Sequence, residues 1–193
     1  VLSKLSACSR LDVLQHPTLG VLKCIESLAK LYEEKYENKV ADEYFKKYQS
    51  MFQHLYGNNS LVPAAAHGYF VLGLASHHKG RYAEAEQLYN KSLQTYQQIY
   101  GASADHPAIA RLYKEMGQNL VTLQNHTAAK HYLQMSLDMY RRLYGDNSDR
   151  ADIADALSIL GCCFSDMGDH REAIINLTLS LNMYKRIHGE DSD

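Results

Sequence analysis

A fixed period of 44 residues is the feature that most constrains how this chain can fold. The segments FQHLYG, YQQIYG, YRRLYG and YKRIHG end at Gly57, Gly101, Gly145 and Gly189, each 44 residues after the one before. Cutting after these glycines gives four copies that align without a gap, residues 14–57, 58–101, 102–145 and 146–189. Self-similarity at a fixed period is typical of repeat proteins, in which each copy is one supersecondary unit. We therefore expect four structural repeats.

Two short segments fall outside the four copies. Residues 1–13 have helical spacing at Leu2, Leu5 and Cys8, which indicates an N-terminal helix or the last helix of a preceding repeat. Residues 190–193 read as the start of a further junction. Because the chain also begins without an initiator methionine, we expect it to be a fragment of a larger protein.

Each copy is predicted to be a pair of helices, A and then B. The apolar residues recur at helical spacing, as Leu157, Leu160 and Phe164 do in the fourth copy. Pro63 and Pro107 stand in register where A helices should start, and Gly80 and Gly168 stand where they should end. A pair this short cannot bury both its faces, so stacked neighbours must complete each core. The predicted fold is all-α, a right-handed α-solenoid of antiparallel helix pairs.

Composition argues against several classes of partner. Lys and Arg number 20 against 22 Asp and Glu, so the chain lacks the basic surplus that binds nucleic acid or anionic lipid. No stretch approaches the roughly 18 apolar residues of a membrane span, and residues 1–20 do not resemble a signal peptide. We expect no nucleic-acid partner, no membrane partner and a cytoplasmic location.

Catalytic and metal-binding motifs are not found in the sequence. The four cysteines, Cys8, Cys24, Cys162 and Cys163, form no CxxC pair and are interpreted as reduced, partly buried thiols. His77 and His78 point about 100 degrees apart on a helix and are interpreted as solvent-facing. No nucleophile with a base and no phosphate-binding loop is present. We therefore expect no enzyme activity, no cofactor and no metal.

The acidic segment GDNSDRAD invites comparison with an EF-hand calcium loop. Counting from Asp146, Arg150 and Leu157 stand where such a loop needs oxygen ligands. The segment is therefore interpreted as a junction between helices, in which Asp149 or its neighbour can cap the next A helix.

The copies resemble the tetratricopeptide repeat. In the second copy the matching residues are Tyr69, Leu72, Gly73, Gly80, Tyr82, Ala85 and Tyr89, and in the fourth they are Leu157, Leu160, Gly161, Gly168, Ala173 and Leu177. The first copy is the most degenerate, with Ala29 and Tyr36 in place of two of the glycines. The resemblance covers residues 14–189, although the ordinary repeat has about 34 residues.

Long repeats with a junction such as IYGASADHPAIA are similar to those of kinesin light chains and of the nephrocystin-3 type of signalling protein. This resemblance implies a cytoplasmic adaptor or scaffold that holds a peptide in a concave groove. The paired asparagines of kinesin light chains are replaced here by Glu26-Ser27, Phe70-Val71, Lys114-Glu115 and Ser158-Ile159. The basic clamp of chaperone-binding repeats is also missing. Neither family's ligand is therefore carried over.

By register with the family, the groove residues come from the face of each A helix that points away from helix B. They are Lys23, Glu26, Lys30, His67, Phe70, Leu74, His78, Arg111, Lys114, Gln118, Asp155, Ser158 and Cys162. Phe70 and Leu74 have two interpretations, either an apolar anchor site flanked by the cations Arg111 and Lys114 or ordinary core packing.

Two functions are consistent with this pattern. The first is an adaptor that binds an extended or helical peptide with one bulky side chain and a nearby acid. The alternative is a structural spacer or self-association segment of a larger protein, because the last B helix lacks its neighbour and an exposed apolar face favours association.

Overall fold

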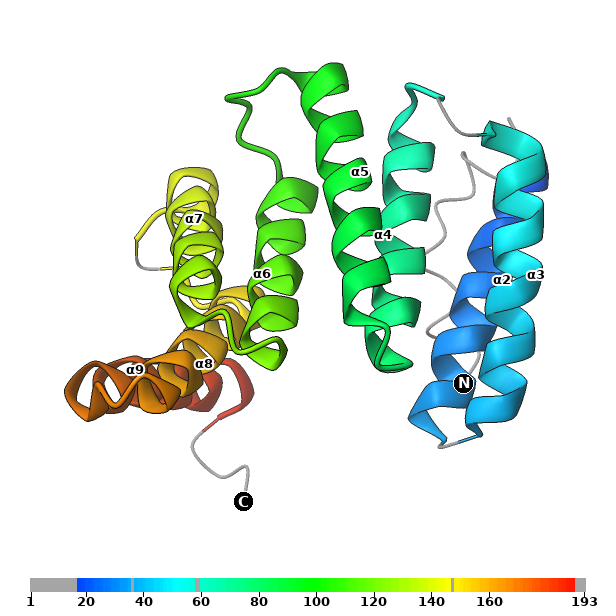
Figure 1. Ribbon diagram of the computed structural model, residues 1–193. Coiled ribbons are helices and arrows are strands. Elements are labelled where there is room, and N and C mark those ends of the chain that lie inside the picture. The colour runs from blue at the N-terminus through cyan, green and yellow to red at the C-terminus, as the bar shows by residue number, and fades with distance from the viewer. Residues whose placement is uncertain (1–16, 36, 58–59, 147, 190–193) are drawn as a thin grey trace. The chain divides into compact units, whose positions relative to one another are not determined.

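The computed structural model describes residues 17–35, 37–57, 60–146 and 148–189, and within them all regular structure is helical (Figure 1). The helices are α2 (Pro17–Glu34), α3 (Asn38–Tyr56), α4 (Pro63–His78), α5 (Tyr82–Tyr100), α6 (Pro107–Thr122), α7 (His126–Tyr144), α8 (Ala151–Asp166) and α9 (His170–His188). The predicted all-α fold is confirmed. The segments 1–13 and 190–193 lie outside the described residues, as does Cys8.

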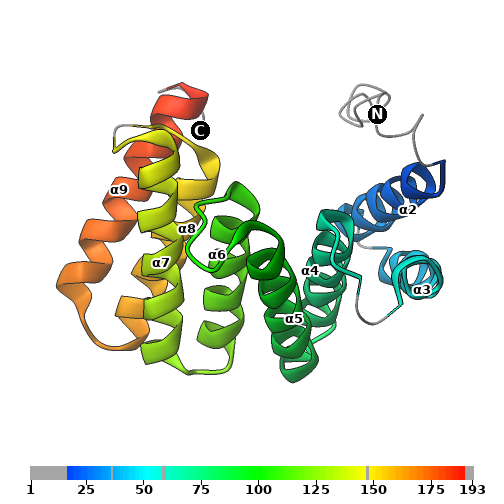
Figure 2. The same cartoon turned by 90° about the horizontal axis from the view of Figure 1, so that it is seen from above.

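The chain divides into two compact units. Unit 1 comprises residues 1–61 and contains the pair α2 and α3. Its small residues Ala29 and Ala41 are buried, and so are the larger Phe45 and Phe52. Unit 2 comprises residues 62–193 and contains the three pairs α4–α5, α6–α7 and α8–α9. In unit 2 the helices follow one another in chain order (Figure 2).

Within unit 2, each A helix approaches its B helix closely at a glycine. A Cβ atom on Gly73 would lie 2.5 Å from the Tyr89 ring, and one on Gly117 would lie 2.6 Å from Leu133 Cγ. Gly161 stands in the same relation to Leu177, at 2.7 Å. Side chains at these three positions would collide with helix B, so the glycines allow the two helices to pack closely.

The helix ends follow the predicted signals. Pro63 and Pro107 are the first residues of α4 and α6, as expected. Gly80 and Gly168 follow α4 and α8 with φ angles of +73° and +80°, which a glycine adopts without strain. The equivalent position after α6 holds Gln124, which adopts the same region with a φ of +59°.

A buried serine on each B helix of unit 2 joins it to the preceding A helix. Ser92 Oγ donates to Ala66 O at 2.8 Å, Ser136 Oγ to Ala110 O at 2.7 Å and Ser180 Oγ to Ala154 O at 2.7 Å. The three bonds recur at the 44-residue period. They fix the position of helix B along the axis of helix A in each pair of unit 2.

The junction acids form ion pairs and do not cap helices. Arg186 donates to both carboxylate oxygens of Asp149, with the closest nitrogen and oxygen 2.7 Å apart, and Arg142 binds Asp105 in the same way. The hydrogen bonds from Arg186 lower the pKa of Asp149. The N-cap of α8 is Arg150, whose side chain accepts nothing, so the expected capping by Asp149 or its neighbour is wrong. None of the described helices is long and apolar enough to cross a membrane.

Candidate functional site

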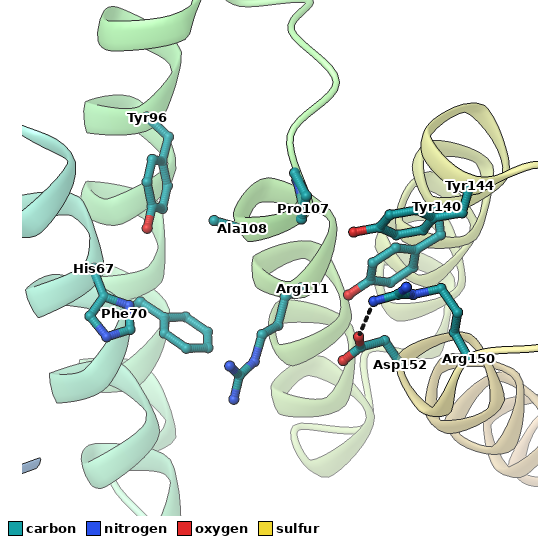
Figure 3. Close-up of a pocket in the computed structure, with 10 residues that line it drawn as sticks. All are labelled: His67, Phe70, Tyr96, Pro107, Ala108, Arg111, Tyr140, Tyr144, Arg150 and Asp152. Carbon is teal, nitrogen blue, oxygen red and sulfur yellow. Dashed lines mark ion pairs between the residues drawn. The ribbon is translucent and has the colours of Figure 1, made fainter. Parts of the chain in front are cut away.

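A cleft of about 260 Å³ opens in unit 2 between the A helices α4, α6 and α8 and the ends of the B helices α5 and α7. Its lining residues, which define the cleft below, are His67, Phe70, Tyr96, Pro107, Ala108, Arg111, Tyr140, Tyr144, Arg150 and Asp152 (Figure 3). Three of the predicted groove residues, His67, Phe70 and Arg111, are brought together here. The other seven come mainly from helix ends and junctions.

Phe70 forms the floor of the cleft at one side. Its side chain is only 4% exposed, and its ring lies 6.2 Å from the ring of Tyr89 and 6.0 Å from that of His67. Of the two interpretations of Phe70, burial against neighbouring helices holds. An incoming side chain would therefore meet only a small part of this ring.

Arg111 covers Phe70 from the solvent side. Its guanidinium carbon lies 5.1 Å from the centre of the Phe70 ring, at the distance of a cation–π contact. Arg111 itself is exposed and forms no ion pair with any described residue. Its N–H groups are therefore available to a ligand, and its planar face is held in place by the aromatic ring below it.

Two buried tyrosines line the cleft beside Arg111. Burial raises the pKa of Tyr96 to about 12, a rise that the charge of Arg111 partly opposes. Burial also raises the pKa of Tyr140, with a further contribution from Asp152. Both phenols therefore stay protonated at neutral pH, and each can donate a hydrogen bond.

The opposite side of the cleft is formed by Arg150 and Asp152. The guanidinium carbon of Arg150 lies 3.9 Å from the centre of the Tyr144 ring. Its closest approach to Asp152 is also 3.9 Å, too long for a hydrogen bond. The buried Nε atom of Arg150 has no hydrogen-bond partner in the structure.

Sequence reasoning missed this side of the cleft, although the repeat contained a signal for it. His106 stands 44 residues before Arg150 and stacks on Tyr100 with ring centres 4.3 Å apart. The same junction position therefore covers the last B-helix tyrosine in two successive copies. His106 also caps α6, because its Nδ1 accepts from Ala108 N at 3.1 Å.

Lys114 does not flank the site as a free cation, and that expectation is wrong. Its side chain is 9% exposed, and Nζ lies 3.2 Å from Asp155 and 3.3 Å from Glu115. Asp155 also accepts a hydrogen bond from the Tyr184 hydroxyl. Two predicted groove residues, Lys114 and Asp155, thus bind each other and connect α6 to α8 and α9.

The remaining predicted groove residues lie outside the cleft. Leu74, Gln118 and Ser158 are half-buried, whereas His78 and Cys162 are exposed. Lys23, Glu26 and Lys30 belong to unit 1, where Lys30 forms an ion pair with Glu26.

His77 is not solvent-facing, contrary to expectation. It is half-buried, and its Nδ1 lies 2.9 Å from Asn119 Oδ1. Asn119 in turn donates to Tyr82 O at 3.1 Å. One repeat later, Cys163 takes the place of Asn119 and donates to His126 O at 3.5 Å. Burial raises the pKa of the Cys163 thiol, which disfavours the reactive thiolate and agrees with a packing role.

Comparison with known proteins identifies the repeat. The family model described as tetratricopeptide repeat matches residues 63–142 and again 108–186. The crystal structure of BtubC (BKLC) from P. vanneervenii superimposes with a TM-score of 0.68 at 17% sequence identity. The match covers 89% of this chain and 66% of that one, so the chain spans just under two thirds of the BtubC structure.

A second solved structure shows weaker similarity. A crystal structure of Podosopora anserina putative kinesin light chain nearly identical TPR-like repeats matches with a TM-score of 0.44 and 13% identity, over 90% of this chain and 99% of that one. No curated protein sequence matches the chain.

Proposed function

Because the chain belongs to the tetratricopeptide repeat family, whose members generally mediate protein–protein interactions, we propose that unit 2 holds a peptide segment of a partner protein in the cleft. The observation that carries this proposal is the placement of Arg111. Its guanidinium is exposed, forms no ion pair with the described residues and lies over the buried Phe70 ring, 5.1 Å from the ring centre. A cation fixed in this way over an aromatic floor is suited to anchor one side chain of a bound segment.

The chemistry of the cleft favours a bulky side chain close to an acid. The guanidinium of Arg111 lies over Phe70 and is exposed to solvent, so an incoming aromatic or aliphatic group can pack against its exposed side. Its N–H edge can donate to a carboxylate or a backbone carbonyl, as can the hydroxyls of Tyr96 and Tyr140. An extended segment or a helix could present such groups. The module would then serve as a non-catalytic, cytoplasmic adaptor or scaffold.

The proposal predicts that Arg111→Glu lowers partner capture. Reversing the charge should repel an acidic group and lower the recovery of bound partners about tenfold or more, while the helix content stays the same because Arg111 is exposed. Affinity capture from cell lysate with quantitative mass spectrometry measures this recovery. Arg171→Glu, at an exposed arginine on α9 outside the cleft, is the matched control. Equal recovery by the two variants would refute the assignment of the cleft.

A second candidate function, self-association, is supported by the surface of α9. Ile174 and Leu181 are 66% and 55% exposed, and Ile175, Leu177 and Leu179 are exposed as well. One repeat earlier, α7 places Lys130 and His131 at the exposed positions that Ile174 and Ile175 occupy on α9. Apolar residues thus replace polar ones on this surface.

Self-association through α9 predicts a dimer or larger species in analytical ultracentrifugation at high protein concentration. The double variant Ile174→Lys, Ile175→His, which copies the residues of α7, should return the chain to a monomer. A wild-type chain that sediments only as a monomer at every concentration contradicts this second candidate.

A further inference from the structure

We propose that the cleft receives a phosphorylated tyrosine side chain of the partner, with the phosphate held between Arg111 and Arg150. This inference rests on the proposed function, because it names the chemistry of the residue that the cleft anchors. It follows from the charges, the stacking geometry and the lining of the cleft.

The polar groups that line the cleft are mostly hydrogen-bond donors. Arg111 and Arg150 carry two positive charges, and Asp152 is the one acidic residue among the lining residues. Tyr96 and Tyr140 remain protonated, because burial raises the pKa of each phenol. The lining therefore has a net positive charge and offers donors from several directions, which suits an oxyanion.

Both guanidinium groups lie over aromatic rings and make no hydrogen bond to a described residue, although Arg150 has a long ion-pair contact with Asp152 at 3.9 Å. Arg111 lies over Phe70 at 5.1 Å and Arg150 over Tyr144 at 3.9 Å, and both side chains extend into the cleft (Figure 3). Stacking uses the flat face of a guanidinium and leaves its edge free for bidentate contacts to phosphate. The carboxylate of Asp152 is 3.9 Å from the terminal nitrogen of Arg150, so a ligand oxygen there would displace no short hydrogen bond.

The charge balance favours a phosphate ester over a single carboxylate. Asp152 lies 3.9 Å from Arg150 and offsets part of its positive charge. A carboxylate brings one negative charge, whereas a phosphorylated side chain brings about 1.5 to 2 at neutral pH and three acceptor oxygens. With more charge and a third acceptor oxygen, the phosphate ester is better suited than a carboxylate to binding both arginines while Asp152 remains ionised.

The size and walls of the cleft indicate an aromatic carrier for the phosphate. At about 260 Å³ the cleft is larger than a tetrahedral anion requires. The rest of its lining includes the rings of Phe70, Tyr96, Tyr140 and Tyr144. An aryl ring can pack edge-to-face or offset against these side chains, which an isolated anion cannot do.

The direct test uses small probes on the 193-residue chain. Calorimetric or NMR titration should show that phenyl phosphate binds about tenfold more tightly than phenylacetate, and also more tightly than inorganic phosphate. Equal affinity for phenylacetate would overturn the requirement for phosphate. Equal affinity for inorganic phosphate would overturn the requirement for an aromatic carrier, and the lack of any saturable binding at millimolar concentration would overturn the whole inference.

Two substitutions shift the affinity for phenyl phosphate in opposite directions. Arg150→Ala should weaken binding about tenfold because it removes a charge-assisted contact, whereas Arg171→Ala should leave binding unchanged. Asp152→Asn should strengthen binding several-fold because it removes the opposing charge. A misfolded variant cannot mimic this gain, so weaker or unchanged binding by Asp152→Asn contradicts the proposed position of the phosphate.

A phosphatase experiment separates this inference from the proposed function. Treating the lysate with a tyrosine phosphatase before affinity capture should remove those partners that Arg111→Glu also fails to recover. If Arg111→Glu lowers capture but phosphatase treatment does not, the peptide-binding cleft stands and the phosphotyrosine assignment is wrong. If Arg111→Glu has no effect on capture, the proposed function itself fails.

Discussion

The Leu133→Ala variant should lose about 2 to 5 kcal/mol of free energy of unfolding, as expected when a fully buried leucine is truncated and a cavity remains. Leu133 on α7 is 0% exposed. It packs on Gly117, where even a Cβ atom would come within 2.6 Å of its Cγ. The loss is measured by urea denaturation followed by far-UV circular dichroism.

Leu177→Ala is the matched control for this prediction, because Leu177 occupies the same repeat position one copy later. It packs on Gly161 in the same way but is 39% exposed, since none of the described helices follows α9 and covers it. Truncating a half-covered leucine removes less apolar surface from the core, so its cost should be clearly smaller. Equal losses in the two variants would show that stacking of the next helix pair does not stabilise this position.

The second large effect is expected from Ala85→Leu on α5. Ala85 is 0% exposed and stands at the position where a small residue recurs in every copy. A larger side chain would overpack the pair α4–α5 and lower the free energy of unfolding by about 1 to 3 kcal/mol. Thermal denaturation compared with wild type measures this destabilisation.

Ala83→Leu tests whether the effect of Ala85→Leu comes from packing. Ala83 lies two residues earlier on the same helix and is exposed, and leucine has nearly the helix propensity of alanine. Its melting temperature should therefore stay close to that of wild type. If Ala85→Leu melts like Ala83→Leu, the helix register used throughout unit 2 is wrong.

The fold could be predicted from the sequence because its determinants are local and repeated. Pro63 and Pro107 begin A helices, and the glycines after α4 and α8 end them. Each of these residues affects only the helical turn next to it. The interhelical serines could also have been found, since Ser92, Ser136 and Ser180 recur at the same period. A single serine is common on helix surfaces, so only its recurrence at this period indicates an interhelical role.

Only part of the candidate site could be predicted from the sequence, because contacts between helices decide which residues come together there. Register placed His67, Phe70 and Arg111 on one side of the A helices, and they do line one cleft. Register alone could not show that Arg111 would fold over Phe70, or that Lys114 would turn to Asp155 on the next A helix. Such pairings depend on how neighbouring repeats pack.

Arg150 illustrates the same limit at a junction. In the sequence it stands among acids and reads as part of a loop, whereas in the structure its stacking on Tyr144 brings it into the cleft. The acids of this junction have a local role, since Asp149 binds Arg186 on α9. The residue of this segment that lines the cleft is the arginine, which neither a calcium loop nor a helix cap requires.

Photo-crosslinking from the cleft tests the central claim, that unit 2 binds its partner there, most directly. Tyr144 lines the cleft, whereas Tyr132 on the same helix is equally half-buried and lies outside the cleft lining. Replacing either with benzoylphenylalanine keeps an aromatic ring at that position. The account predicts that captured partners crosslink to position 144 and not to position 132. Crosslinks from position 132 alone, or equally from both positions, would contradict it.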